Sequence, residues 1–328
     1  MPTSRRTLIK TIGLAPAVTL LPRSAFAAYP DRPIHLVVPF APGGNADIVG
    51  RLVGQGMSDA LKQTVVVDNR GGAGGSIGAE IVAHATPDGY LLLVGSNGPL
   101  TVNPFVQAKM SYDPQKDLAP IALTSYVPHV IIVTNSLPAK TIPELIALSK
   151  TQQVSIATSG VGSATHLTLA RFNAQTGAKL VHVPYRSGGS LLPDLISGHI
   201  QGAMTELSTA LPQHKGGKAR IVGIAAAQRS KLVPEVETMI EGGVKDFIAS
   251  SYIGILAPAG TPKDAIAQLQ KSVEKTLSGN SVSAERLRAM GSEIATAEQM
   301  TPPGFAAFIR TDYEHSREAA KLAGLKPQ

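Results

Sequence analysis

Short apolar runs alternate with helical patterns along almost the whole chain. Eight runs predict strands: Ile34–Val38, Val65–Val67, Leu91–Val94, His129–Val133, Val154–Ala157, Lys179–Val183, Ala219–Ala226 and Ile253–Ala257. The helical patterns predict helices at Ala46–Leu61, Ser76–Ala85, Ile142–Lys150, Ala164–Thr176, Leu191–Ser197, Lys263–Leu277, Ser281–Met290 and Pro303–Leu322. Because strands separated by helices favour a largely parallel sheet covered on both faces, the predicted class is α/β.

Two of the apolar runs lead into segments that are typical of crossings between lobes. Residues 130–133 continue into Asn135-Ser136-Leu137-Pro138, and residues 252–257 continue into Pro258-Ala259-Gly260-Thr261-Pro262. A chain that crosses at both places makes a hinged pair of lobes with a cleft between them. The expected division is residues 28–132 with 256–328 in domain 1 and residues 133–255 in domain 2. Each lobe is expected to hold a mostly parallel sheet, and the two crossover strands are expected to form the hinge.

Four turns rich in glycine and small polar residues follow predicted strands, at residues 39–47, 95–98, 158–166 and 184–190. In open parallel sheets, ligands bind beyond the carboxyl ends of the strands, and free N–H groups at a helix start attract anions. A single turn of this kind is equally well explained as a tight turn with a helix cap, but four of them favour a shared polar cleft. The candidate ligand-binding residues are Pro42, Gly43, Gly44, Asp47, Ser96, Asn97, Ser159, Gly160, Gly162, Ser163, His166, Tyr185, Gly188 and Glu206.

Several of these candidates have a second interpretation. Asp47 would repel an anion if it faced one, so a role as helix cap is favoured, with Asn45 as the other possible cap. His166 either donates to a ligand or satisfies a buried backbone carbonyl. Tyr185, with Arg186 beside it, either closes over a ligand or faces solvent. Glu206 either pairs with a ligand ammonium or belongs to a structural ion pair.

Catalytic motifs are mostly missing from the sequence. It contains no G-x-S-x-G elbow, no H-E-x-x-H and no phosphate-binding G-x-x-x-x-G-K-[ST], and residues 160–165 lack the third glycine of a dinucleotide fingerprint. The eight histidines are scattered without metal-ligand spacing, and there is no cysteine. We therefore expect no cofactor, no metal and no catalytic residue, and the favoured class is a binding protein rather than an enzyme.

The N-terminus has the layout of an export signal. Ser4-Arg5-Arg6-Thr7-Leu8-Ile9-Lys10 precedes an apolar run that ends near Leu21, and Ala25-Phe26-Ala27 is a small-x-small cleavage site. The paired arginines are typical of the twin-arginine type, so residues 1–27 are expected to be removed in the periplasm. Cleavage removes four basic residues and no acidic one, which lowers the formal net charge from +7 to +3. So small a charge does not call for a nucleic-acid partner.

The residues also resemble a known family. The matching segments are Tyr29 to Ile34, Val38 to Gly44 with Asp47, Val67 to Gly78, Pro87 to Tyr90, Gly160 to His166, His182 to Tyr185 with Gly188, and Ala257 to Pro262. In this order they resemble the solute receptors of tripartite tricarboxylate transporters, also called Bug-type receptors. The resemblance covers essentially the whole mature chain.

The resemblance implies a two-lobed periplasmic binding protein of type II topology that delivers small carboxylates to membrane permease subunits. It implies that the carboxylate is held by residues 42–44 with Asp47 and by residues 159–163 with His166. In two places the chain departs from the family: Arg186-Ser187 stands where a Lys/Arg-Gly pair is common, and Glu206 where many members have an aspartate. We expect a monomer that closes around its ligand. The alternatives are an exported enzyme on the same fold and a ligand sensor for a membrane histidine kinase.

Overall fold

The computed structural model describes residues 29–327, so the predicted signal peptide at 1–27 lies outside the described residues. The first lobe begins with three parallel strands in the order β2-β1-β3. Its first elements are β1 (Ile34–Val38), α1 (Asn45–Leu61), β2 (Val65–Asn69), η1 (Ala73–Gly75), α2 (Ser76–Ala83), β3 (Leu91–Ser96), η2 (Gly98–Val102) and α3 (Asn103–Val106). Four of the five β1 residues are buried, as expected for an apolar strand covered on both faces.

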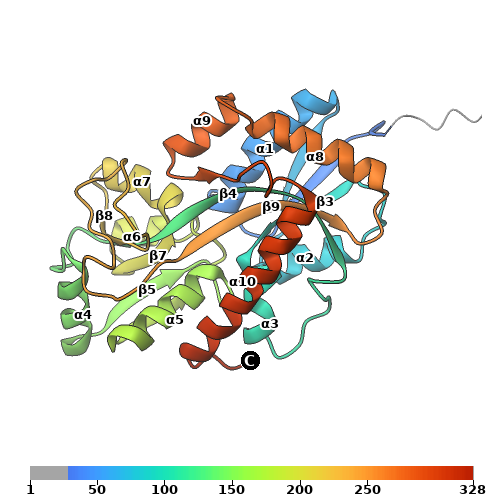
Figure 1. The fold of residues 1–328 in the computed structure, drawn as a ribbon. Coiled ribbons are helices and arrows are strands. Elements are labelled where there is room, and N and C mark those ends of the chain that lie inside the picture. Colours follow the sequence, from blue (N-terminus) through green and yellow to red (C-terminus); the bar gives the residue numbers. More distant parts are fainter. Residues whose placement is uncertain (1–28, 328) are drawn as a thin grey trace, which may run out of the picture.

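Two long antiparallel strands join the lobes. β4 (Leu118–Val133) and β9 (Ser250–Pro258) pair from Leu118 opposite Pro258 to Pro128 opposite Ser250. They run side by side through the middle of the molecule, between two groups of helices (Figure 1). β9 also pairs antiparallel with β3, and the short β10 (Glu293–Ile294) pairs with β4. The structure therefore has the two predicted crossover strands.

The second lobe repeats the α/β pattern on the other side of these strands. Its elements are α4 (Ile142–Thr151), β5 (Val154–Thr158), α5 (Ala164–Thr176), β6 (Leu180–Pro184), α6 (Leu192–Ser197), β7 (Gly202–Glu206), α7 (Leu207–Lys215) and β8 (Arg220–Ile224). β7, β5 and β6 are parallel to one another, whereas β4 is antiparallel to both β7 and β8. The sheet is thus mixed: the parallel strands expected in each lobe are present, and the crossover strands add the antiparallel pairs.

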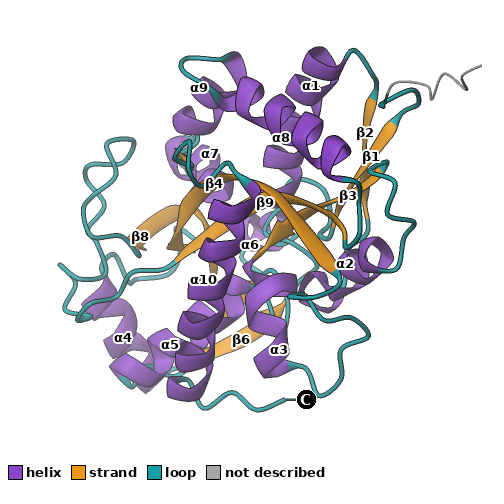
Figure 2. Ribbon diagram, turned by 45° about the vertical axis from the view of Figure 1, so that its right-hand side comes forward, coloured by secondary structure: helices purple, strands orange, loops and turns teal. Residues whose placement is uncertain are grey.

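The C-terminal helices return to the first lobe. α8 (Lys263–Leu277) and α9 (Val282–Ala289) pack beside α1, and α10 (Pro302–Leu322) contacts β4, η2 and α5. α10 passes in front of the crossover strands and ends beside α3 and α5 (Figure 2). It therefore touches both lobes. No helix within residues 29–327 combines the length and the apolar character needed to cross a membrane.

The hydrophobic core divides along β4. Leu118 to Leu123 pack with β1, β3 and β9 in one cluster, whereas Val127 to Val133 belong to two clusters on either side of the second sheet. A small fourth cluster combines Val102 and Val106 with Leu167 of α5 and Ala320 of α10. Apolar contacts thus join the lobes where α3, α5 and α10 meet.

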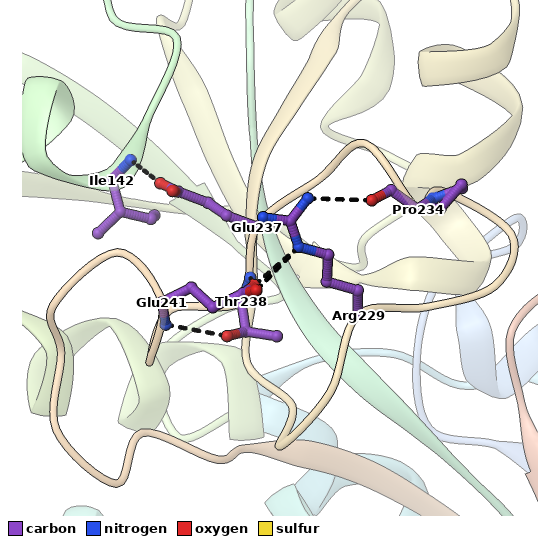
Figure 3. A network of polar contacts seen from close by, with 6 residues as sticks. All are labelled: Ile142, Arg229, Pro234, Glu237, Thr238 and Glu241. Atoms are coloured by element: carbon purple, nitrogen blue, oxygen red, sulfur yellow. Dashed lines mark hydrogen bonds and ion pairs between the residues drawn. The ribbon is translucent and has the colours of Figure 1, made fainter.

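A long connection without helix or strand links β8 to β9. Its polar network is drawn in Figure 3: the Arg229 guanidinium donates to both carboxylate oxygens of Glu241 and to the carbonyl of Pro234. Glu241 also exchanges hydrogen bonds with Thr238, and Glu237 accepts from the backbone N–H of Ile142 at the start of α4. These bonds fix the connection against the second lobe.

Candidate functional site

A narrow cavity lies between the lobes, where β1, β3, β5 and β7 reach their carboxyl ends. It is lined by Phe40, Gly44, Asn45, Ala46, Ser96, Ser159, Ser163, Ala164, Ser187, Gly188, Glu206, Ser251 and Ile253. The cavity has a volume of about 30 Å³, which is room for about two water molecules. The lobes are therefore closed over it.

The turn between β1 and α1 forms one side of the cavity. Gly44 is the N-cap of α1, and no side chain caps the helix. Asp47, expected to be the cap, instead stands inside the first turn of the helix and accepts from the N–H of Gly43 at 3.0 Å. Its carboxylate also accepts from Arg51 and from the Asn69 amide, 2.9 Å away, and it does not line the cavity. The prediction that Asp47 is the N-cap of α1 was wrong, but the Asp47 carboxylate does hold the turn in shape.

The electrostatics of Asp47 follow from these bonds. Burial favours the neutral acid, but hydrogen bonds from Arg51, Gly43 and Asn69 outweigh burial and lower the pKa of Asp47. The carboxylate is therefore charged at neutral pH. A negative charge in the first turn of a helix is also favourable for the helix dipole.

The turn between β5 and α5 forms the opposite side. Ser163 caps α5: its hydroxyl accepts from the N–H of His166 at 3.2 Å and donates to the carbonyl of Gly160 at 2.7 Å. The Thr165 hydroxyl accepts from the N–H of Ser159 at 3.0 Å. Gly160 has φ +111° and Gly162 has φ +81°, a region that favours glycine. Hydroxyls and glycine together hold this turn.

Both turns present unused backbone donors. No hydrogen bond within residues 29–327 uses the N–H of Asn45, Ala46 or Ala164, all three of which line the cavity. These groups stand in the first turns of α1 and α5, where the helix dipole carries partial positive charge. Two helix N-termini at one cavity favour a negatively charged group such as a carboxylate.

Glycines allow the lobes to meet. A Cβ added to Gly189 would lie 2.4 Å from the carbonyl carbon of Gly43, and one added to Gly44 would lie 3.4 Å from the N atom of Gly188. The N–H of Ala41 donates to the carbonyl of Arg186 across the same boundary at 3.3 Å. Backbone therefore touches backbone, and a larger residue at position 189 would hold the lobes apart.

Six of the predicted site residues line the cavity: Gly44, Ser96, Ser159, Ser163, Gly188 and Glu206. Pro42 and Gly43 are exposed beside it, and Gly162 packs against the side chain of Asn103. Gly160 lies with Tyr185 along a wider neighbouring cleft of about 530 Å³ that residues of both lobes line. The Tyr185 hydroxyl donates to Asp194, 2.5 Å away, and is not free to close over a ligand in this state.

Two further predicted residues have structural partners. His166 Nδ1 accepts from the N–H of Gly162 at 3.3 Å, and its ring stacks on His182 with centroids 4.3 Å apart. Burial lowers the pKa of His166, which keeps the ring neutral. The Asn97 side chain bonds the N–H of Tyr252 and Asp312 of α10, and it faces a groove beside α5 and α10 rather than the cavity.

Sequence reasoning missed seven lining residues: Phe40, Asn45, Ala46, Ala164, Ser187, Ser251 and Ile253. Five of them lie within the predicted turns. They would have been found if every residue of each turn had been taken as a candidate. Ser251 and Ile253 are different, because they lie within crossover strand β9, where no local signal distinguishes them. Asn45, the other residue expected to cap α1, accepts instead from Ser208 of α7, 2.9 Å away across the cavity boundary.

The chemistry of the lining is simple. Glu206 is the only acidic residue in it, and lysine, arginine and histidine do not occur. Within residues 29–327 there is also no group of three or more His, Cys, Asp or Glu side chains arranged to hold a metal ion. The cavity is equipped to form hydrogen bonds.

The family profile described as "Tripartite tricarboxylate transporter family receptor" matches residues 49–316. The chain belongs to this receptor family. Protein BugT of Bordetella pertussis is 33% identical over 324 residues, covering 97% of this chain and 98% of BugT. These matches confirm the resemblance to Bug-type receptors.

Solved structures of receptors support the same assignment. The periplasmic binding protein BugD superposes with a TM-score of 0.88 at 33% identity, covering 92% of this chain and 100% of BugD. MatC from Rhodopseudomonas palustris, solved with bound malate, gives a TM-score of 0.85 at 30% identity, covering 89% of this chain and 99% of MatC. These likenesses confirm the two-lobed α/β fold of a periplasmic binding protein.

Proposed function

We propose that this receptor binds a small carboxylate in the cavity between its lobes and delivers it to the permease subunits of a tripartite tricarboxylate transporter. The observation that carries the proposal is the pair of helix N-termini with unused N–H groups at one enclosed cavity. Membership of the family and the malate bound to MatC support a carboxylate as the ligand. We infer that Gly44 and Ala46 on one side and Ser159, Ser163 and Ala164 on the other contact it.

Entry of the ligand requires the lobes to separate. A cavity of about 30 Å³ has no room for an acid of malate's size, and β4 and β9 are the strands that connect the lobes. We infer a hinge motion at these strands between an open, ligand-accepting state and the closed one. The division into domains at 132/133 and 255/256 belongs to this proposal.

We infer that the protein works in the periplasm. Periplasmic relatives and the export-signal layout of residues 1–27 support export with cleavage near Ala27. We infer a monomer that presents its closed form to the membrane permease. We also infer that it is not an enzyme, since Glu206 is the only acidic group at the cavity and no basic side chain lines it.

The proposal is tested by binding. Mature protein, freed of bound small molecules by unfolding and refolding, should show a raised melting temperature with at least one member of a panel of mono- and dicarboxylic acids. Isothermal titration calorimetry then gives its dissociation constant. A well-folded, ligand-free protein that responds to no acid in the panel would contradict the proposal.

A pair of glycine variants tests closure. Gly189→Ala places a methyl group against the Gly43 backbone only when the lobes are closed, so it should weaken binding of the identified acid at least about tenfold. Gly217→Ala is the control, because a methyl group there would meet no atom within 4 Å and the residue does not line the cavity. Small-angle scattering with ligand should show a larger radius of gyration for Gly189→Ala. Equal affinities for the two variants would reject this form of closure.

A further inference from the structure

Glu206 is a buried carboxylate at the ligand cavity. It stands at the end of β7, is 8% exposed and does not cap α7, which starts at the next residue. Its Oε1 accepts from the Ser251 hydroxyl and its Oε2 from the Thr205 hydroxyl, each at 3.1 Å. The backbone of Gly188 lies close to this carboxylate, since a Cβ added to Gly188 would lie 3.1 Å from Oε2 of Glu206.

No cationic side chain within residues 29–327 pairs with this group, although it stands at the start of α7. None of the ion pairs within residues 29–327 includes Glu206, and no cationic side chain lines the cavity. His129 approaches from behind, with Nε2 2.8 Å from Ser251 Oγ, so that Ser251 stands between it and Glu206. Burial, with a smaller effect from Arg171, lowers the pKa of His129 to about 3, so this ring is neutral.

An unpaired buried carboxylate is costly. Burial raises the pKa of Glu206, although hydrogen bonds from its own backbone N–H, Ser251 and Thr205 act in the opposite direction. Two hydroxyl donors and the start of α7 stabilise the carboxylate only in part, because no full positive charge faces it in a poorly solvated place. A cationic donor from a bound molecule would supply the missing partner.

The cavity therefore offers two kinds of binding group to one ligand. The N–H groups of Asn45, Ala46 and Ala164 favour a carboxylate, and Glu206 favours a positively charged donor. A simple dicarboxylate suits only the first kind and brings a negative charge toward Glu206. An amino acid suits both.

We propose that the ligand is a small zwitterion of the amino-acid class, with its carboxylate at the starts of α1 and α5 and its ammonium paired with Glu206. This inference rests on the proposed function, since it assigns a chemical class to the ligand of that same cavity. The Glu206 side chain is long enough to place its carboxylate at the cavity wall beside Gly188.

The experiment compares acids that differ only in an amine. Refolded, ligand-free mature protein is titrated by calorimetry with three pairs: L-alanine and propionate, L-aspartate and succinate, L-glutamate and glutarate. In at least one pair the wild-type protein should bind the amino acid at least about tenfold more tightly, as expected for a charge-assisted bond in a buried site. A plain acid bound as tightly as its amino partner in every responsive pair would overturn the inference while leaving the proposed carboxylate receptor intact.

Two variants locate the effect. Glu206→Gln preserves the size of the side chain and removes its charge, and it should abolish most of the preference for the amine. Glu285→Gln changes one exposed charge on α9, away from the cavity, and should keep the preference. A preference that survives Glu206→Gln contradicts the assignment of the ammonium to this residue. If Glu206→Gln fails to fold, as judged by circular dichroism, the wild-type pairs decide alone. Failure of every acid and amino acid to bind the wild-type protein would instead reject the proposed function, and the inference with it.

Discussion

The turns that precede α1 and α5 both place free backbone N–H groups at the cavity, but different kinds of side chain hold them in shape. The α1 turn is held by a charged side chain, Asp47, which reaches back to the N–H of Gly43 and is itself held by Arg51 and Asn69. The α5 turn is held by neutral hydroxyls, with Ser163 as a true N-cap. Both leave backbone donors of the first helical turn unused. What the two turns share is thus the free N–H groups. In one turn a charged network positions them, and in the other a network of hydroxyls does so.

The largest effect is expected from removing the charged network. Asp47→Ala leaves the N–H of Gly43 without its acceptor and removes one of the two acceptors of the Asn69 amide, which should lower the free energy of unfolding by about 2–3 kcal/mol. Glu314→Ala is the control, because that carboxylate is exposed on α10 and pairs with the exposed Arg317, so its loss should cost less than about 1 kcal/mol. Urea unfolding measures both. Similar losses in the two variants would mean that the α1 turn does not depend on Asp47.

A smaller effect is expected from the hydroxyl cap. Ser163→Ala should cost about 1 kcal/mol, the usual contribution of an N-cap. Thr141→Ala removes an equivalent cap from α4, which does not border the cavity, and should cost about the same. Only Ser163→Ala should also weaken ligand binding measured by calorimetry. If both variants kept full affinity, the α5 turn would not be part of the binding site.

The smallest effect concerns pH. The pKa of Asp47 is lowered in the folded state by Arg51, Gly43 and Asn69 despite burial, so the unfolded state takes up a proton more readily. The contribution of Asp47 is therefore complete above the unfolded pKa and is lost as pH falls through the folded pKa. Urea unfolding between pH 6 and pH 3 should show a steeper loss of stability for the wild-type protein than for Asp47→Asn. Substituting Ser163 by alanine should leave the wild-type slope unchanged, and equal slopes for all three proteins would contradict the charged description of the α1 turn.

Much of the fold could be predicted because many of its strands are short, apolar and followed by clear helix starts. β1 coincides with its predicted range, and α5 and α8 also begin where expected. β7 and α7 escaped prediction. β7 reads Gly-Ala-Met-Thr-Glu, which carries little strand preference of its own; it is a strand because β4 and β5 pair with it and its two faces pack into the core clusters of the second lobe. α7 contains Pro212, which masks the helical pattern.

The prediction of β4 was too short for a related reason. Pro120 and Pro128 lie within it, and proline usually marks the end of a strand. In the structure a register shift follows Pro120, and Pro128 is paired with Ser250, the first residue of β9, so neither proline ends the strand. Sequence patterns cannot show that a strand tolerates these prolines, because the tolerance depends on β9, which lies more than 100 positions away in the sequence.

The lining of the cavity was predicted where it is formed by local turns, and residues from elsewhere in the sequence were missed. Gly44, Ser159, Ser163 and Gly188 were found because strand-to-helix turns carry a sequence signal. Ser251 was missed because it resembles any other strand residue, and its importance comes from Glu206 on another strand. Exposure of the candidates Pro42 and Gly43 likewise depends on how the lobes meet.

Because β4 contributes to the hydrophobic cores of both lobes, it limits which chimaeras of this receptor can fold. Residues 118–123 of this strand pack in one lobe and residues 127–133 in the other, while β9 pairs with it along the way. A chimaera that exchanges the middle lobe with that of a relative must therefore transfer half of a continuous strand and match its neighbour residue by residue. Lobes connected in this manner are poor interchangeable modules, so changes in ligand preference are more easily reached through substitutions in the turns than through exchange of a whole lobe.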